Sequence, residues 1–180
     1  MSIFDSSFKE IITSQMVSVF GGLVTGTILA AYTNKILMIP GMLILLPGLL
    51  EMRGNISGTF ASRLSAGLFL GVVKPRLKRT KLINANLAAS FFLAIITSFI
   101  LGMIAFAFTY FVLGVTTAKI IFLPVITAII ANIIEIPVTL FATLSLFKRG
   151  HDPNNIMGPF VTSTGDVTTT LALLAALVII

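Results

Sequence analysis

The sequence predicts an all-α integral membrane protein with five transmembrane helices. Of its 180 residues, 57% are hydrophobic and only 10% are charged, whereas about a quarter of the residues in an ordinary soluble domain are charged. The mean hydropathy is +1.09. A membrane-crossing helix needs about 20 mainly apolar residues, and five stretches of at least that length lie between the charged clusters. A soluble globular protein is therefore nearly excluded.

Two further counts narrow the kinds of site that the chain can hold. There is no cysteine and only one histidine, His151, so disulfides, cysteine-ligated metal centres and histidine-rich metal sites are not expected. The net charge of +6 does not indicate nucleic acid binding, because the basic residues lie in short breaks between apolar runs, where they set membrane orientation. The expected partners are the lipid bilayer and whatever crosses it.

The first predicted span covers about residues 11–33, which contain no charged residue. The preceding residues lack the basic segment and the cleavage site of a signal peptide, so we expect this span to be retained. Small residues recur every four positions along it, a spacing that favours close contact with another helix. They are Ser18, Gly22, Gly26 and Ala30.

The second predicted span covers residues 37–73, which are too many for one straight crossing. Helix-breaking and charged residues interrupt it at Pro40, Pro47, Glu51, Arg53, Gly54 and Arg63. We therefore expect a broken helix in this segment.

Three more spans follow, and two of them contain a lone acidic residue. Residues 82–113 carry no charge and are rich in Phe and Ile, so we expect a long, tilted helix that faces lipid. The fourth span, residues 120–147, contains Pro124, Pro137 and Glu135, and the fifth, residues 155–180, contains Asp166. An ionisable residue at mid-membrane depth is costly, and it is therefore a functional-site hypothesis by default.

The basic residues of the connecting segments predict the orientation, because cytoplasmic loops carry the excess of Lys and Arg. One side of the membrane receives Lys9, Lys74, Arg76, Lys78, Arg79, Lys81, Lys148 and Arg149. The other side receives only Lys35 and Lys119. This asymmetry predicts a cytoplasmic N-terminus and, with five spans, an extracellular C-terminus. We expect a multi-pass protein of the plasma membrane.

A polar stripe runs along the fifth span. In GPFVTSTGDVTTT, helical spacing places Gly158, Thr162, Asp166 and either Thr169 or Thr170 on one face. Hydroxyl groups and a carboxylate are hard oxygen ligands, which suit Mg²⁺ or Ca²⁺ or the waters around these ions. The stripe therefore predicts an ion pathway. The alternative is a carboxylate that is protonated or hydrogen-bonded to threonines between packed helices.

A second polar stripe lies in the broken helix, in RGNISGTFASRLS. Asn55, Thr59 and Ser62 fall on one helical face, beside the small residues Gly54, Gly58 and Ala61. The second and fifth spans are thus the predicted walls of a pore. Such polar residues also bond across helices or to their own backbone in many membrane proteins, which is the alternative explanation.

The two stripes together carry a family resemblance. RGNISGTFASRLS and DPNNIMGPFVTSTGD resemble the two pore motifs of the MgtE family of magnesium channels, and the first is particularly similar to the GN…T.ASRLS pattern of solute carrier family 41. The resemblance covers essentially the whole chain and implies one transmembrane domain, residues 1–180, with the motifs on the second and fifth of five helices. The large cytoplasmic sensor domains of the bacterial channels are not expected here.

The resemblance also implies roles for individual residues. Asp166 corresponds to the central pore carboxylate, Asn55 and Thr59 lie near the same ion, and Asp152 matches an acid at the cytoplasmic mouth. Family 41 members contain two such five-helix units, which implies that this single unit works as a homodimer.

Charge balance supports the dimer independently of the resemblance, because two carboxylates related by a two-fold axis balance one Mg²⁺. Since Mg²⁺ gives up its waters reluctantly, we expect Asp166, Asn55, Thr59 and Thr162 to bind the hydrated ion. Charge alone does not separate Mg²⁺ from Mn²⁺, Co²⁺ or Ca²⁺.

The remaining membrane-depth charges leave two interpretations open. Glu135 is either a secondary ion or proton site, or it forms a structural pair with Arg63. Arg53 and Arg63 are expected to extend towards the membrane surface, or to pair with Glu51 or with an acid on a neighbouring helix.

The function that these observations favour is divalent cation transport, with Mg²⁺ as the first candidate. An Na⁺-coupled Mg²⁺ exchanger and a non-transporting membrane subunit are the alternatives. Enzyme activity is not expected. An aspartyl intramembrane protease needs a second aspartate at the depth of Asp166, and a serine protease needs a histidine within the membrane, and the sequence provides neither.

Overall fold

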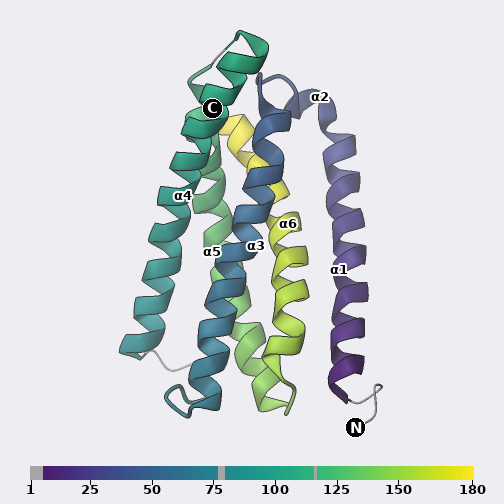
Figure 1. Ribbon diagram of the computed structural model, residues 1–180, viewed down its shortest axis with the longest axis vertical. Coiled ribbons are helices and arrows are strands. Elements are labelled where there is room, and N and C mark those ends of the chain that lie inside the picture. Colours follow the sequence, from purple (N-terminus) through teal and green to yellow (C-terminus); the bar gives the residue numbers. More distant parts are fainter. Residues whose placement is uncertain (1–5, 77–79, 116) are drawn as a thin grey trace.

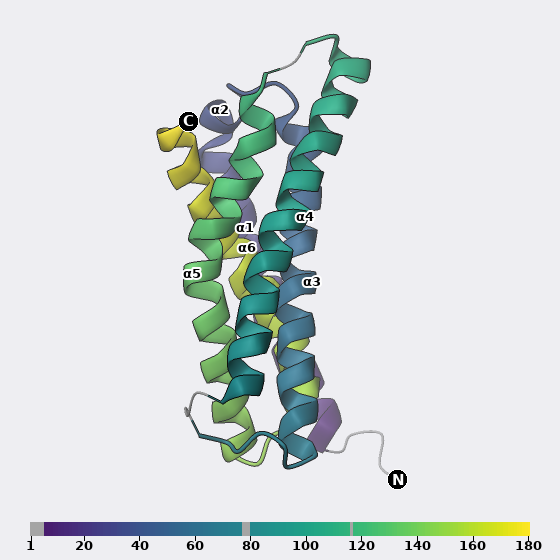
Figure 2. The ribbon, with the colours of Figure 1, turned by 90° about the vertical axis from the view of Figure 1, so that its left-hand side faces the viewer.

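The computed structural model describes residues 6–76, 80–115 and 117–180, and every regular element among them is a helix. The helices are α1 (Ser6–Ala31), α2 (Thr33–Ile36), α3 (Met42–Phe69), α4 (Lys81–Leu113), α5 (Lys119–Lys148) and α6 (Pro153–Ile179). The long helices run side by side along the long axis of the molecule, and α2 is a single turn between α1 and α3 (Figures 1 and 2). The all-α prediction is confirmed.

Four of the described helices are long and apolar enough to cross a membrane, namely α1, α4, α5 and α6. α3 has 28 residues, but the polar side chains of Glu51, Arg53 and Asn55 near its middle lower its hydropathy. In the bundle, α3 nevertheless lies alongside the others over their length (Figure 1). Four of the five predicted spans therefore have the length and composition of membrane helices, and the crossing by α3 stays a prediction.

The predicted broken helix over residues 37–73 needs a correction. The break lies before α3, at residues 37–41, where Gly41 has a φ of +83°, a conformation that glycine adopts without steric cost. α3 itself continues without interruption through Pro47 and Gly54. Pro47, in the second turn of α3, cannot donate to the carbonyl oxygen of Leu43, but the helix continues past this missing hydrogen bond.

The connections between helices alternate between the two ends of the bundle, as the charge asymmetry predicted. The beginning of α1, the α3–α4 connection and the α5–α6 connection lie at the lower end in Figure 1, and α2 and the α4–α5 connection lie at the upper end. Lys81 begins α4 and Lys148 ends α5 at the lower end, whereas Lys119 begins α5 at the upper end. Lys78 and Arg79 lie outside the described residues, and the cytoplasmic assignment of the lower end stays a prediction.

The helix α6 is central to the packing. It contacts α1, α3 and α5, while α4 packs against α3 and α5. A buried apolar cluster joins α3, α5 and α6 and includes Leu45, Leu49, Leu123, Leu173 and Ala176. The face of α4 that points away from α3 and α5 exposes a row of large apolar side chains, as expected of a helix that faces lipid. They are Phe92, Ile96, Phe99, Met103 and Phe108.

The packing face of α1 differs from the predicted one. Gly22 and Gly26 have no neighbouring atoms within 4 Å of a Cβ position, and Ala30 is exposed. The face that meets α6 instead carries Gly21, opposite Ser163, and the buried Ser14. A regular spacing of small residues indicates a smooth helix face, but it does not determine which face of the helix a neighbour covers.

The contact between α4 and α5 leads to a testable prediction. A Cβ at Gly102 would overlap the backbone carbonyl oxygen of Ile121. We expect Gly102→Ala to destabilise the protein by about 1–3 kcal/mol, because the backbone of α5 must move to make room for the methyl group. Thermal unfolding in detergent measures the effect, and Gly22→Ala, where a Cβ meets open space, is the matched control. Equal melting temperatures for the two variants would contradict this close packing of α4 on α5.

Candidate functional site

Consecutive residues of the TSTGD segment of α6 face different neighbours. The hydroxyl of Thr162 lies 3.4 Å from a Cβ position at Gly54 of α3, and Ser163 faces Gly21 of α1. The hydroxyl of Thr164 donates a hydrogen bond to Oε1 of Glu135 on α5, with a distance of 3.1 Å. Asp166, one helical turn after Thr162, returns to the side of α3. This one segment of α6 thus touches each of the three helices that surround it.

A polar groove of about 670 Å³ lies between α3 and α6. Its lining residues are Pro47, Leu50, Glu51, Gly54, Asn55, Gly58, Thr59, Ser62, Arg63, Gly158, Thr162 and Asp166. Glu51, Asn55, Thr59 and Thr162 are exposed along it and Asp166 is half-buried, so the groove is open on one side of the chain. The small residues Gly54, Gly58 and Gly158 leave the space that forms it.

Few of the polar groups in the groove bond to one another. Nδ2 of Asn55 donates to Oε1 of Glu51 at 3.2 Å, and the hydroxyl of Thr162 donates to the carbonyl oxygen of Gly158 at 3.0 Å. No described residue donates a hydrogen bond to the carboxylate of Asp166. Two carboxylates and several neutral oxygen atoms are thus available to a ligand in the groove, and these are ligand types suited to a hard cation.

The structure brings together four of the six predicted ion-binding residues. Asn55, Thr59, Thr162 and Asp166 all line the groove, near the middle of α3 and α6. Ser62 and Gly158 line it as well. The predicted continuation of the stripe to Thr169 or Thr170 is wrong, because both side chains are fully buried and do not line the groove.

Asp152 and Glu135 lie away from the groove. Asp152 is the N-cap of α6, where Oδ1 accepts a hydrogen bond from the backbone N–H of Asn154 at 2.8 Å. Glu135 on α5 is 1% exposed, and its Oε1 accepts the hydrogen bond from Thr164, which lies on a different face of α6 from the groove residues. Ion binding by Asp152 or Glu135 stays a prediction.

The two arginines of α3 have different environments. Arg53 is fully buried and Nη1 donates to Oδ1 of Asn132 on α5, and its charge attracts that of Glu135. Arg63 instead is exposed and lines the groove. The predicted pair of Arg63 with Glu135 is therefore wrong. Among the described residues, Arg53 and Glu135 form no direct ion pair, and their side chains interact by longer-range Coulombic attraction.

Sequence reasoning missed one residue of the groove as a candidate ligand, Glu51. It precedes Asn55 by one helical turn, and this spacing was the signal that places both on the same face. Across the described residues, no three His, Cys, Asp or Glu side chains form a group that holds a metal ion.

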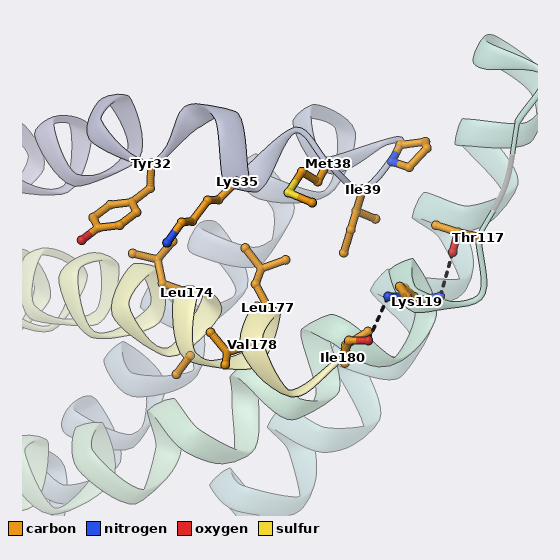
Figure 3. Close-up of a pocket in the computed structure, with 12 residues that line it drawn as sticks. Tyr32, Lys35, Met38, Ile39, Thr117, Lys119, Leu174, Leu177, Val178 and Ile180 are labelled. Atoms are coloured by element: carbon orange, nitrogen blue, oxygen red, sulfur yellow. Dashed lines mark hydrogen bonds between the residues drawn. The ribbon is translucent and has the colours of Figure 1, made fainter.

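Another cavity, of about 750 Å³, lies at the C-terminal end of α6, beside α2. Figure 3 shows Lys35 and Lys119 among its lining side chains, together with Tyr32, Leu174 and Leu177. Nζ of Lys119 donates to the carbonyl oxygen of Ile180 at 2.9 Å. Two lysine side chains and no acidic side chain are among the residues that line this cavity, whereas Glu51 and Asp166 line the groove.

Comparison with known proteins adds independent evidence. A family model for MgtE, described as a divalent cation transporter, matches residues 46–176, a range that includes most of α3 and of α6. The chain is 29% identical to solute carrier family 41 member 2 of Gallus gallus over 178 residues, which are 92% of this chain and 30% of the relative.

Two further relatives show the same pattern. Solute carrier family 41 member 2 of Homo sapiens is 32% identical over 139 residues, 73% of this chain and 24% of the relative. Solute carrier family 41 member 3 of Rattus norvegicus is 32% identical over 143 residues, 74% of this chain and 30% of the relative. The chain thus spans less than a third of the length of the relatives it matches.

Proposed function

The chain belongs to the MgtE family of divalent cation transporters, and on this premise we propose that it carries Mg²⁺ across the membrane along the groove between α3 and α6. One observation carries the proposal: Asn55, Thr59, Thr162 and Asp166, which lie on two helices far apart in the sequence, line a single groove. Asp166 is the central ion-binding carboxylate in this proposal.

The chemistry of the groove suits a hydrated divalent cation. Carboxylates attract cations strongly where protein and lipid keep the dielectric constant low. The other groove residues offer amide and hydroxyl groups, which hydrogen-bond to the water shell that Mg²⁺ retains. Mn²⁺, Co²⁺ and Ca²⁺ are further candidate substrates, because the charge of the site alone does not separate them from Mg²⁺.

We further propose that a second copy of the chain closes the groove. The groove is open along one side, so the polar groups of one chain can face an ion from only part of its surroundings. A two-fold axis beside the groove would place two copies of Asp166 across one pore. The assembly would lie in the plasma membrane with the beginning of α1 on the cytoplasmic side, and Asp152 would then lie near the cytoplasmic entrance.

The neutral groups of the groove are expected to control selectivity. We predict that Asn55→Ala or Thr59→Ala changes the ratio of Mg²⁺ to Ca²⁺ uptake by about two- to tenfold, because each removes one hydrogen bond to the water shell of the ion. Thr27→Ala is the matched control, since the Thr27 hydroxyl bonds only to Leu23 of its own helix and lies outside the groove. An unchanged ratio together with a lower melting temperature would assign Asn55 and Thr59 to packing instead.

The proposed function is tested by uptake of Mg²⁺ into liposomes that contain the purified wild-type chain. Uptake driven by the Mg²⁺ gradient alone indicates a channel-like pathway. Uptake that follows an imposed Na⁺ gradient indicates the Na⁺-coupled exchanger, which is the second candidate. Empty liposomes give the background, and wild-type uptake at the background level would contradict transport by this chain and favour a non-transporting subunit.

A further inference from the structure

A buried polar cluster lies behind the groove and has no part in the proposed contacts with the ion. Its members are Arg53 on α3, Asn132 and Glu135 on α5, and Thr164 on α6. Arg53 is 0% exposed, and Asn132 and Glu135 are each 1% exposed. We infer that these residues form a positioning cluster, which holds the two walls of the groove in register by tying each wall to α5.

The hydrogen bonds of the cluster connect both walls to the same helix. Nη1 of Arg53 donates to Oδ1 of Asn132, which joins α3 to α5. The hydroxyl of Thr164 donates to Oε1 of Glu135 at 3.1 Å, which joins α6 to α5. Asn132 and Glu135 lie on the same face of α5, almost one turn apart. A shift of α3 or α6 along the bundle therefore breaks a bond to α5.

Charge makes the arrangement hard to change. An arginine stays protonated under all ordinary conditions, so the buried Arg53 needs a negative charge close by. Glu135 is the acidic member of the cluster, and Coulombic attraction acts between the two side chains. A neutral Glu135 would leave Arg53 as an isolated buried cation.

The cluster lies close to the groove residues in the chain and in space. Gly54 and Asn55, which follow Arg53, line the groove. On α6, a Cβ position at Gly165 lies 3.7 Å from Oε1 of Glu135, so the carboxylate rests against the backbone immediately before Asp166. The positions of Asn55 and Asp166 relative to each other thus depend on how Arg53 and Glu135 are held.

The test compares two threonine variants with the same chemical change. Thr164→Val removes the single hydroxyl proton that Oε1 of Glu135 shares with the carbonyl oxygen of Phe160. Thr127→Val on α5 removes only a bond of the same local kind, to the carbonyl oxygen of Leu123. A loss of local helix bonding affects both variants, whereas a loss of positioning affects Thr164→Val alone.

The first readout is transport. It rests on the proposed function, because the positioning cluster affects ion binding only if the groove carries the ion. In liposomes, we expect Thr164→Val to change the Mg²⁺ concentration for half-maximal uptake, or the ratio of Mg²⁺ to Ca²⁺ uptake, by about two- to tenfold. Thr127→Val is expected to keep both values at the wild-type level. If Thr164→Val alters only the amount of folded protein and leaves both values unchanged, the positioning role is overturned.

A second readout separates the inference from the proposed function. The chain has no cysteine, so Thr59→Cys and Thr162→Cys introduce two unique sites for spin labels on the two walls of the groove. We expect Thr164→Val to shift or broaden the distance distribution between the labels, and Thr127→Val to leave it unchanged. This result needs no transport, so it holds or fails whether or not the wild type carries Mg²⁺. Identical distributions in both variants would overturn the inference.

Discussion

Asp166→Asn is expected to lower the rate of divalent cation uptake roughly tenfold or more, while the protein still folds. The substitution removes the charge of the one acidic side chain at the centre of α6 that lines the groove, and it changes the volume of the side chain very little. No described residue hydrogen-bonds to this carboxylate, so the amide breaks no contact of the fold. The measurement is the initial rate of Mg²⁺ uptake into liposomes at equal amounts of folded protein.

Glu10→Gln is the control for this prediction, because it makes the same change from carboxylate to amide outside the groove. Glu10 lies near the beginning of α1, where it contacts His151 and Asn155. We expect its uptake rate to stay at the wild-type level. Full uptake by Asp166→Asn would remove this residue from the ion pathway, and an equal loss in both variants would show that the effect does not depend on the groove.

The second large effect concerns stability. Glu135→Gln keeps the shape of the side chain but leaves Arg53 without its negative partner in a fully buried position. Removal of one member of a buried charge pair costs about 3–5 kcal/mol. We therefore expect a large drop in the melting temperature of the purified protein in detergent, measured at constant pH and detergent concentration.

A double variant shows whether charge is the cause of that loss. Arg53→Met combined with Glu135→Gln removes both charges, and uncharged replacements of a buried ion pair are often tolerated. We expect the double variant to melt at a higher temperature than Glu135→Gln alone. If the double variant is instead the less stable of the two, the destabilisation comes from lost packing, and the charge pair is not what holds Arg53 in place.

Helical periodicity explains why the groove was predictable. Asn55 and Thr59 are one turn apart, as are Gly158, Thr162 and Asp166, so each set shares a face in any α-helix. The structure confirms that both faces line one groove. A polar face on an otherwise apolar membrane helix is costly to expose to lipid, so two such faces are expected to face each other or a polar cavity.

The features that were not predictable from the sequence depend on the rotation of each helix against its neighbours. Arg53 and Arg63 lie on the same helix, but only Arg53 faces α5. The four-residue spacing of Asn55, Thr59 and Arg63 places Arg63 on the groove face, whereas the buried partner of Arg53 on α5 depends on tertiary packing. In α1, the face with Gly21 packs against α6 instead of the face with Gly22 and Gly26. Small and polar residues occur on several faces of these helices, and tertiary contacts select among them.

The most direct test of the central claim is whether cations pass along the groove between α3 and α6. Because the chain has no cysteine, Thr59→Cys places one thiol in the groove, and Thr27→Cys on the exposed side of α1 is the matched control. A charged, membrane-impermeant thiol reagent is applied to liposomes that contain either variant, and Mg²⁺ uptake is measured before and after. We predict that modification blocks uptake by Thr59→Cys, that Mg²⁺ slows the modification, and that Thr27→Cys is unaffected. Unchanged uptake by a fully modified Thr59→Cys would contradict passage of the ion along this groove.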